Sequence, residues 1–495
     1  MEDEGGDRRE SLLSGEALIA AVKGSVIGAF PMNWKGFYSV SIDSRGIEEG
    51  GLFVPLSGAV NNGHTFITQA LERGASAVLI ADMEYTEKPD YWKQLAGDWR
   101  EVLFILTEKT LTALQNAAAA YIDRFPGLLR IAVTGSSGKT TTKDISGSIF
   151  SASMPSIMNE GNRNSETGMP LSVFGIREEH RAGIFEMGMD HRGEISALAK
   201  VLRPHLALIT NIGTAHIGIL GSKAAIAEEK KAIFSCFSGD DRGFVPENDD
   251  FREFLMKDTA ESVSPWGFDS AGIANIRNNG LKGSLFTVDG LEVSFPLPGR
   301  FNLRNAAAAV TLARAAGIPA EQIQQGLEAV KPLFGRGEVF DGPVTVIQDC
   351  YNSNPDSFEN ALELCDEIEW RGRRVYILAD MRELGPESCA AHERAGELLA
   401  FSRGDVIILF GPEMKHAYEV LLNRGGDRGC GGKEVIYTTD IADVIAETVN
   451  RIRAGDMVFL KGSRFMELER VTPAILEWNR TYTGDAPGAS QRGGG

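Results

Sequence analysis

The stretch Val133–Thr142 reads VTGSSGKTTT, and the interpretation of the whole chain starts from it. An apolar run, Leu128–Val133, precedes it, and a helix-like segment, Lys143–Phe150, follows it. A buried strand, a glycine-rich turn and a helix start together bind phosphate, because backbone N–H groups and the helix dipole point at the anion. Lys139 would reach the terminal phosphates of a nucleotide, and the Thr140 hydroxyl would bind Mg²⁺. The stretch therefore predicts a nucleotide-dependent enzyme.

The match to the usual phosphate-binding loop is incomplete. That pattern has a glycine, four residues and then Gly-Lys-Ser/Thr, which would place the first glycine where Val133 stands. Here the loop begins at Gly135 and is two residues shorter. The alternative is an ordinary strand-to-helix turn with an exposed lysine. The coincidence of the strand, both glycines, the lysine and the hydroxyls favours phosphate binding.

Length and charge limit the class of protein. A chain of 495 residues suggests three domains of about 150 residues each. Its net charge of −18 argues against duplex nucleic acid or an anionic membrane as a general partner. A local basic pocket could still bind a nucleotide.

The cysteines and the apolar segments indicate a cytoplasmic protein. Five cysteines are scattered without a CxxC pair, which is typical of reduced thiols in a cytosol. The first ten residues lack an apolar signal-peptide core, and no run of 18 apolar residues occurs. We therefore expect no membrane insertion.

Strand-like and helix-like patterns divide the chain into an α/β protein with three domains. A small α/β domain is expected over residues 1–127, a phosphate-loop domain with a parallel sheet over 128–331, and a Rossmann-like, doubly wound domain over 332–480. The tail 481–495 is glycine-rich and is expected to be disordered.

Polar residues follow several expected strands directly. They are Glu186, Asn211, Asp349 and Asp380. In open α/β sheets the ligand crevice lies beyond the carboxyl ends of the strands. We therefore expect these residues to share a cleft with the phosphate loop.

A metal site requires more than one hydroxyl, and Glu186 is the candidate carboxylate ligand. His216 stands in another strand-end loop, where a structural role and a ligand role are about equally expected. The segment Ile226–Phe234 reads as an amphipathic helix with two adjacent lysines, Lys230 and Lys231. Local sequence alone favours a solvated charged face for them.

These residues together resemble the Mur ligase family, the ATP-dependent amide-forming enzymes of peptidoglycan synthesis. The resemblance covers nearly the whole chain through the ordered motifs SIDSR (41–45), NGHTF (62–66), the 135–141 loop, GNRN (161–164), EMG (186–188), GEI (193–195), TAH (214–216), LPGRFN (297–302), DCYNSNP (349–355), DMRELG (380–385) and KGSR (461–464).

The resemblance implies a role for each matching residue. The phosphates of ATP would bind at Gly135, Ser136, Ser137, Gly138, Lys139, Thr140 and Thr141, and Mg²⁺ would bind at Thr140, Glu186, His216 and a carbamylated Lys230. The adenine would lie at Asn302 and Asn305, and Arg336 and Asp349 would approach ATP from the third domain. The UDP end of the acceptor would lie near Ser44, Arg45 and His64, and its peptide would lie near Asn162 and Asn164. Lys139, Glu186, His216 and Lys230 would form the catalytic group.

The implied activity is an ATP-dependent amide ligation. It would join D-Ala-D-Ala to UDP-MurNAc-tripeptide through an acyl phosphate, and we expect the protein to act as a monomer.

Three residues depart from the family pattern and bear on this interpretation. Phe301 stands where ligases that add D-Ala-D-Ala usually have histidine, and phenylalanine at this position resembles the ligase that adds the third residue. Ser165 and Lys231 stand where asparagine and glycine are frequent.

Three alternatives therefore remain. The first is a ligase that adds the third residue to UDP-MurNAc-dipeptide. The second is an enzyme like folylpolyglutamate synthetase, whose loop usually lies near the N-terminus. The third is a nucleotide-dependent binding or regulatory protein without catalysis. The third residue of the acceptor peptide is left open between lysine, ornithine and diaminopimelate.

Overall fold

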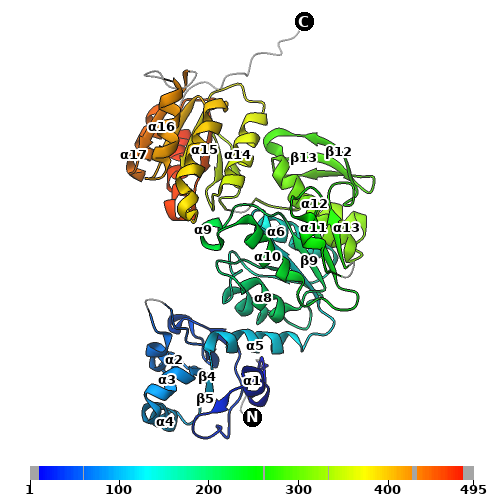
Figure 1. The fold of residues 1–495 in the computed structure, drawn as a ribbon, viewed down its shortest axis with the longest axis vertical. Coiled ribbons are helices and arrows are strands. Elements are labelled where there is room, and N and C mark those ends of the chain that lie inside the picture. Colours follow the sequence, from blue (N-terminus) through cyan, green and yellow to red (C-terminus); the bar gives the residue numbers. More distant parts are fainter. Residues whose placement is uncertain (1–9, 59–60, 260–261, 333, 426–431, 483–495) are drawn as a thin grey trace, which may run out of the picture.

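Three α/β domains follow one another in the computed structural model, which confirms the expected fold class (Figure 1). The structure describes residues 10–58, 61–259, 262–332, 334–425 and 432–482. The N-terminal domain, drawn in blue, lies at one end of the molecule, and the third domain, drawn in yellow to red, lies at the other. The central domain lies between them.

The N-terminal domain is built on a sheet in the order β1–β5–β4–β3–β2, in which β1 alone is antiparallel to its neighbour. Its strands are β1 Ser25–Val26, β2 Ser39–Ser41, β3 Gly51–Phe53, β4 Ala77–Ala81 and β5 Leu103–Thr107, and its helices are α1 Gly15–Val22, α2 Ile67–Glu72, α3 Asp82–Glu87, α4 Pro89–Asp98 and α5 Thr110–Ile122.

Helix α5 attaches this domain to the central one. It packs against α7 (Gly168–Val173) and α8 (Glu194–Leu202) of the central domain, and the Tyr121 hydroxyl donates a hydrogen bond of 2.6 Å to the Ile176 carbonyl. Arg203 of the central domain pairs with Asp123 just beyond α5. Apolar side chains of both domains therefore form one continuous core.

The central domain has a wholly parallel sheet in the order β11–β10–β9–β6–β8–β7. Its strands are β6 Leu129–Thr134, β7 Ser156–Met158, β8 Ala182–Glu186, β9 Leu206–Ile209, β10 Arg242–Pro246 and β11 Val263–Trp266, and its helices are α6 Lys139–Ser153, α7 Gly168–Val173, α8 Glu194–Leu202, α9 Ile217–Leu220, α10 Lys223–Lys231, α11 Arg252–Met256, α12 Arg300–Ala315 and α13 Ala320–Glu328.

Strand β6 lies inside this sheet, and both of its faces are buried. Ile131 and Val133 pack in the same cluster as residues of α6, α12 and α13, whereas Ala132 belongs to the cluster that contains α5, α7 and α8. A strand covered on both faces reads as a continuous apolar run, which is why the sequence revealed it.

An antiparallel sheet between β11 and α12 was not expected from the sequence. It consists of β12 Ile273–Asn278, β13 Ser284–Val288 and β14 Leu291–Phe295, in that order. Burial alternates along β13, and β14 contacts α13. This small sheet therefore extends the core beside α12 and α13.

The third domain has a second open sheet, in the order β15–β16–β20–β17–β18–β19, with only β15 antiparallel to its neighbour. Its strands are β15 Glu338–Phe340, β16 Thr345–Asp349, β17 Arg374–Ala379, β18 Val406–Phe410, β19 Glu434–Thr438 and β20 Met457–Lys461, and its helices are α14 Pro355–Glu367, α15 Ser388–Phe401, α16 Met414–Gly425, α17 Ile441–Arg451 and α18 Val471–Thr481.

Two further expectations concern the C-terminal tail and the membrane. Thr481 is the last residue of α18, and the rest of the expected tail, residues 483–495, lies outside the described residues. Among the helices that the structure describes, none is both long and apolar enough to cross a bilayer.

Candidate functional site

The glycine-rich loop connects β6 to α6, and both of its glycines are required by close contacts. Gly135 has φ +152° and Gly138 has φ +79°. A Cβ on Gly135 would lie 1.8 Å from Thr210 Oγ1, and one on Gly138 would lie 2.4 Å from Asn305 Oδ1. The strand–loop–helix geometry expected for phosphate binding is therefore present.

Asn211, at the end of the neighbouring strand, occupies part of this loop. Its Oδ1 accepts hydrogen bonds from the backbone amides of Ser136 (3.0 Å) and Ser137 (2.9 Å). The expectation of bare amides does not hold at these two residues. The N–H groups at the start of α6, residues 139–141, have no acceptor within the helix and are therefore available to bind an anion.

The Lys139 side chain folds back across the loop. Its Nζ donates to the carbonyl oxygens of Gly135 (2.9 Å) and Ser136 (3.3 Å). Burial lowers the pKa of the Lys139 ammonium, and Glu186 acts in the opposite direction. The ammonium therefore lies at the loop, held only by neutral carbonyl groups that a phosphate would outcompete.

Glu186 ends β8 as a buried carboxylate with one unused oxygen. Its Oε1 accepts a hydrogen bond of 2.6 Å from Asn164 Nδ2, whereas its Oε2 is buried and has no hydrogen-bond partner among the residues that the structure describes. Asn159, which the sequence analysis missed, holds the Glu186 backbone through both its amide oxygen and its amide nitrogen. A buried carboxylate oxygen without a donor is suited to a cation.

His216 gathers two further carboxylates at the same cleft. Its Nδ1 lies 3.5 Å from Asp190 Oδ1 and 3.3 Å from Glu383 Oε2, and the three ligand atoms lie within 4.8 Å of one another. The His216 ring lowers the pKa of the Glu383 carboxyl. Asp190 and Glu383 were not predicted, although Glu383 belongs to the DMRELG motif.

The two adjacent lysines at the end of α10 have opposite environments. Lys230 is 1% exposed, and burial, followed by the nearby charge of Lys139, lowers its pKa well below the usual value. Lys231 instead donates to the carbonyls of Phe254 (2.8 Å) and Lys257 (2.5 Å) near the surface. The solvated-face reading therefore fits Lys231 and is wrong for Lys230.

Residues of the third domain reach the phosphate loop. The Arg336 guanidinium donates a hydrogen bond of 3.1 Å to Thr140 Oγ1 and lies over the Tyr351 ring, 4.2 Å from its centroid. Asp349 pairs with the buried Lys461, whose Nζ lies 2.8 Å from its Oδ2. Lys461 stands in a quoted motif, but its pairing with Asp349 was not anticipated.

A cavity of about 630 Å³ lies between the central and third domains and contains most of the predicted site. The predicted residues that line it are Ser136, Ser137, Gly138, Lys139, Thr140, Thr141, Asn162, Asn164, Glu186, His216, Asn302, Asn305, Arg336 and Asp349. Gly135 and Lys230 lie behind this lining. The aromatic side chains of Trp266 and Phe268 also line the cavity and were not predicted.

Asp380 is the exception among the strand-end residues. Glu186, Asn211 and Asp349 line the cavity, but Asp380 does not. It is fully buried, and its Oδ1 accepts a hydrogen bond of 2.9 Å from the Met414 amide. Its position at a strand end therefore serves the packing of the third domain, which corrects the expectation of a cleft residue.

The two asparagines expected near adenine lie at the start of α12. Asn302 Nδ2 donates to the Pro298 carbonyl at 2.8 Å. Asn305 Oδ1 lies against Gly138 and accepts a hydrogen bond of 3.4 Å from Thr142. Both side chains are buried, so they fix the loop and the wall of the cavity beside it.

The three residues expected near UDP lie in the N-terminal domain, away from the cavity lining. Ser44 Oγ donates to Gln69 Oε1 at 2.6 Å, and Arg45 forms an ion pair of 2.8 Å with Asp43. This pairing lowers the Asp43 pKa to about 2. The exposed Arg45 side chain remains accessible to an anion.

His64 is the third of these residues, and its ring is engaged inside the N-terminal domain. Its Nδ1 lies 3.0 Å from Asn62 Oδ1, and its Nε2 accepts a hydrogen bond of 3.1 Å from the Ala81 amide. Burial lowers its pKa. Both ring nitrogens are therefore used, so His64 shapes the domain here rather than offering a free ligand atom.

A phosphate loop, a buried carboxylate with a free oxygen, and a cleft completed by a second α/β domain define a class of enzyme. They are the parts of a nucleotide-dependent transferase or ligase whose domains close on the substrate. Comparison with known proteins gives the family within that class.

Three domain models of one family match consecutive parts of the chain. They are "Mur ligase family, catalytic domain" over residues 36–121, "Mur ligase middle domain" over 133–313 and "Mur ligase, glutamate ligase domain" over 335–464. The UDP-N-acetylmuramoyl-tripeptide–D-alanyl-D-alanine ligase of Treponema pallidum is 42% identical over 94% of this chain and 99% of its own length. The chain belongs to the Mur ligase family.

Two more relatives extend this finding. The ligase of the same name from Bacillus subtilis is 30% identical over 89% of this chain and 93% of its own. A crystal structure of MurF from Acinetobacter baumannii matches with a TM-score of 0.81 and 28% identity, and it covers 94% of this chain and 98% of that one. The family resemblance seen in the motifs is thus confirmed along nearly the whole chain.

Proposed function

We propose that this protein joins D-Ala-D-Ala to UDP-MurNAc-tripeptide with ATP, giving UDP-MurNAc-pentapeptide, ADP and phosphate. The observation that carries the proposal is the cavity in which the phosphate loop, Glu186 and His216 meet Arg336 and Asp349 of the third domain. Relatives that match over nearly their entire length carry the name of this activity.

The reaction needs activation because a carboxylate is a poor electrophile. The terminal carboxylate of the tripeptide attacks the γ-phosphate of ATP and releases ADP, which gives an acyl phosphate. The amine of D-Ala-D-Ala then attacks the acyl carbon, loses a proton, and phosphate leaves. Lys139 and the first amides of α6 stabilise the charge on the transferred group, and Arg336 approaches it from the other domain.

The donor set of the cleft fits Mg²⁺. Glu186 Oε2 and the Thr140 hydroxyl would hold the ion through oxygen, the ligand atom that Mg²⁺ prefers, and the His216 ring would add a nitrogen. When bound, Mg²⁺ neutralises phosphate charge and orients the γ-phosphate. Asp190 Oδ1 and Glu383 Oε2 lie 3.5 Å and 3.3 Å from His216 Nδ1 and would orient its ring.

Carbamylation of Lys230 forms part of the proposal. A lysine reacts with CO₂ only as the neutral amine, and burial of Lys230 lowers its pKa well below the usual value. The product replaces a cation with an anionic oxygen ligand behind Glu186. A fully buried ammonium is costly, so burial favours the neutral amine that reacts with CO₂.

The acceptor would extend from the N-terminal domain into the cleft. Arg45, beside Ser44, would bind the UDP end, and His64 would shape that region from behind. Asn162 and Asn164 line the cavity near Glu186, where the reacting carboxylate must lie. The proposal also includes a protein that acts as a monomer in the cytoplasm, where ATP is available.

The proposal also includes closure of the third domain onto the central domain. The third domain contacts the central one through Asp356, whose Oδ2 accepts bonds from the Thr214 amide (2.7 Å) and hydroxyl (2.9 Å), and through Asn354, which bonds to Ser137 (3.2 Å). We propose that these contacts form when substrates bind and break for release.

Replacing Gly218 by alanine should impair closure without affecting folding. A Cβ at Gly218 would lie 2.6 Å from Gly385 N and from the Leu384 carbonyl carbon, both in the third domain. We expect kcat/KM to fall about 100-fold, since misplacement by about 1 Å has this cost. Gly127→Ala, which places Cβ in open space, is the matched control. Unchanged kinetics in G218A would contradict closure through this contact.

Phosphate release from ATP tests the activity itself. The purified protein with Mg²⁺ should release phosphate only when UDP-MurNAc-tripeptide and D-Ala-D-Ala are both present, and the product should gain one dipeptide less water by mass. Release with UDP-MurNAc-dipeptide and a free amino acid would instead assign the third-residue activity suggested by Phe301. Comparing lysine-, ornithine- and diaminopimelate-containing tripeptides identifies the acceptor.

A further inference from the structure

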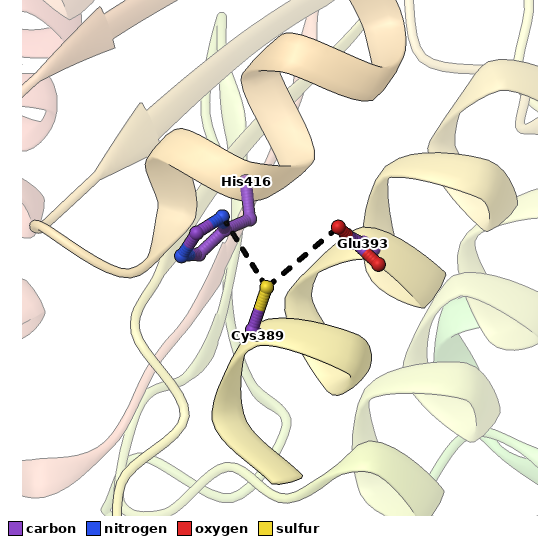
Figure 2. Close-up of side chains that lie close together, drawn as sticks. All are labelled: Cys389, Glu393 and His416. Carbon is purple, nitrogen blue, oxygen red and sulfur yellow. Dashed lines mark hydrogen bonds between the residues drawn. The ribbon is translucent and has the colours of Figure 1, made fainter. Parts of the chain in front are cut away.

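Three side chains of metal-binding type meet on the third domain, outside the cavity. Cys389 and Glu393 stand one helical turn apart on α15, and His416 faces them from α16 (Figure 2). Their ligand atoms lie within 4.8 Å of one another. None of the three lines the cavity between the domains.

The two distances from the sulfur in this cluster match those of a tetrahedral site. Cys389 Sγ lies 3.6 Å from Glu393 Oε1 and 3.6 Å from His416 Nδ1. Zinc bonds of about 2.3 Å to sulfur and about 2.0–2.1 Å to nitrogen or oxygen, opened to the tetrahedral angle, separate such ligand atoms by about 3.6 Å. An ion therefore fits among the three atoms with small side-chain adjustments.

The same geometry argues against a cysteine nucleophile. In a catalytic group the acid orients the histidine, but here Glu393 contacts the sulfur. Desolvation of the exposed Cys389 thiol, followed by the carboxylates of Glu393, Glu413 and Glu419, raises its pKa. These carboxylates disfavour a free thiolate, and the same negative surroundings attract a divalent cation.

We propose that Cys389, Glu393 and His416 bind a zinc-type divalent cation, with a fourth position open to water. The ligand set of one thiolate, one imidazole and one carboxylate selects a borderline-soft ion over Mg²⁺, which prefers oxygen. Binding displaces the thiol proton and joins α15 to α16, the pair of helices with the most extensive mutual packing. This site is independent of the proposed ligase activity.

Cobalt(II) is the probe for the test, because a cobalt–thiolate bond absorbs in the near ultraviolet. The full-length protein, reduced and saturated with Mg²⁺, is titrated with Co²⁺ and then with Zn²⁺. We expect one equivalent of Co²⁺ to produce the thiolate band, Zn²⁺ to remove it, and Zn²⁺ to raise the melting temperature of the protein.

Variants separate this site from other thiols. C389S and H416A should lose the band and the shift in melting temperature, E393Q should weaken binding at least tenfold, and C236S should behave as the unmodified protein. Ligase activity in C389S should be unchanged. A band of equal strength and affinity in C389S, or no band in the unmodified protein, would overturn the proposal.

Discussion

Replacing Lys139 by methionine is expected to lower kcat/KM by about a thousandfold or more while leaving the fold intact. The Lys139 ammonium lies at the phosphate loop, bonded only to the carbonyls of Gly135 and Ser136. When ATP binds, the ammonium leaves these carbonyls for the phosphates, which attract it more strongly. It then stays in contact with the phosphoryl group during its transfer. Removing one such preorganised donor typically costs 10²–10³-fold, and a full charge costs more.

The two kinetic constants should respond differently. Because charge accumulates on the transferred group and its neighbours in the transition state, kcat should fall more than the KM for ATP rises. Steady-state phosphate release measures both, and the melting temperature checks the fold. The side chain is half-buried and has a lowered pKa, so methionine should not destabilise the protein.

The control for this variant is the same substitution at Lys200, an exposed lysine in the last turn of α8. K200M should retain full activity. If K139M kept activity within about threefold of K200M, the loop would not be the site of phosphate transfer, and the interpretation of the chain as a nucleotide-dependent enzyme would fail.

The sequence predicted the features that depend on short stretches of chain. The interior parallel strands appear as continuous apolar runs, and the loop is marked by two glycines that backbone conformation and close contacts require. The sheet β12–β14 escaped notice because its strands are partly exposed, and burial does not alternate along β12. The order of the motifs along the whole chain still identified the family, although this sheet was missed.

Features formed between distant segments could not be predicted. Nothing near Asn211 in the sequence shows that its side chain bonds to the loop, and nothing near Glu383 shows that it meets His216 from another domain. Asp380 stands at a strand end like Asp349, but its orientation depends on how α16 packs. Local patterns fix where a residue lies on its element, while tertiary packing decides which group it meets.

Lys230 and Lys231 show most clearly that local sequence does not predict burial. Both belong to one charged run, and a helical periodicity alone does not distinguish them. In the folded chain one ammonium is 1% exposed and the other bonds to surface carbonyls. The difference in burial, which only the fold reveals, makes Lys230 the lysine for which we propose carbamylation.

Replacing Lys230 by alanine should reduce kcat/KM by about 100- to 1000-fold, and short carboxylates should restore part of it. The substitution removes the proposed anionic ligand and leaves a buried space behind Glu186, so acetate or formate can supply an oxygen there. K231A is the matched control, because Lys231 bonds only to Phe254 and Lys257 carbonyls, and its loss should leave activity unchanged.

Carbon dioxide provides the second arm of this test. Carbamylation consumes the neutral amine, whose fraction grows as pH rises through the lowered pKa of Lys230, so modification should increase with pH over that range. The protein without substitutions should lose activity when it is depleted of CO₂ and bicarbonate at slightly acid pH, and it should recover activity when bicarbonate is added. The activity of K230A should instead rise only with acetate or formate. Labelled bicarbonate should give a carbamate carbon signal by NMR in K231A and none in K230A. Full activity in K230A, or a carbamate signal that persists in it, would contradict the role assigned to this lysine and leave Glu186 and His216 as the protein's metal ligands.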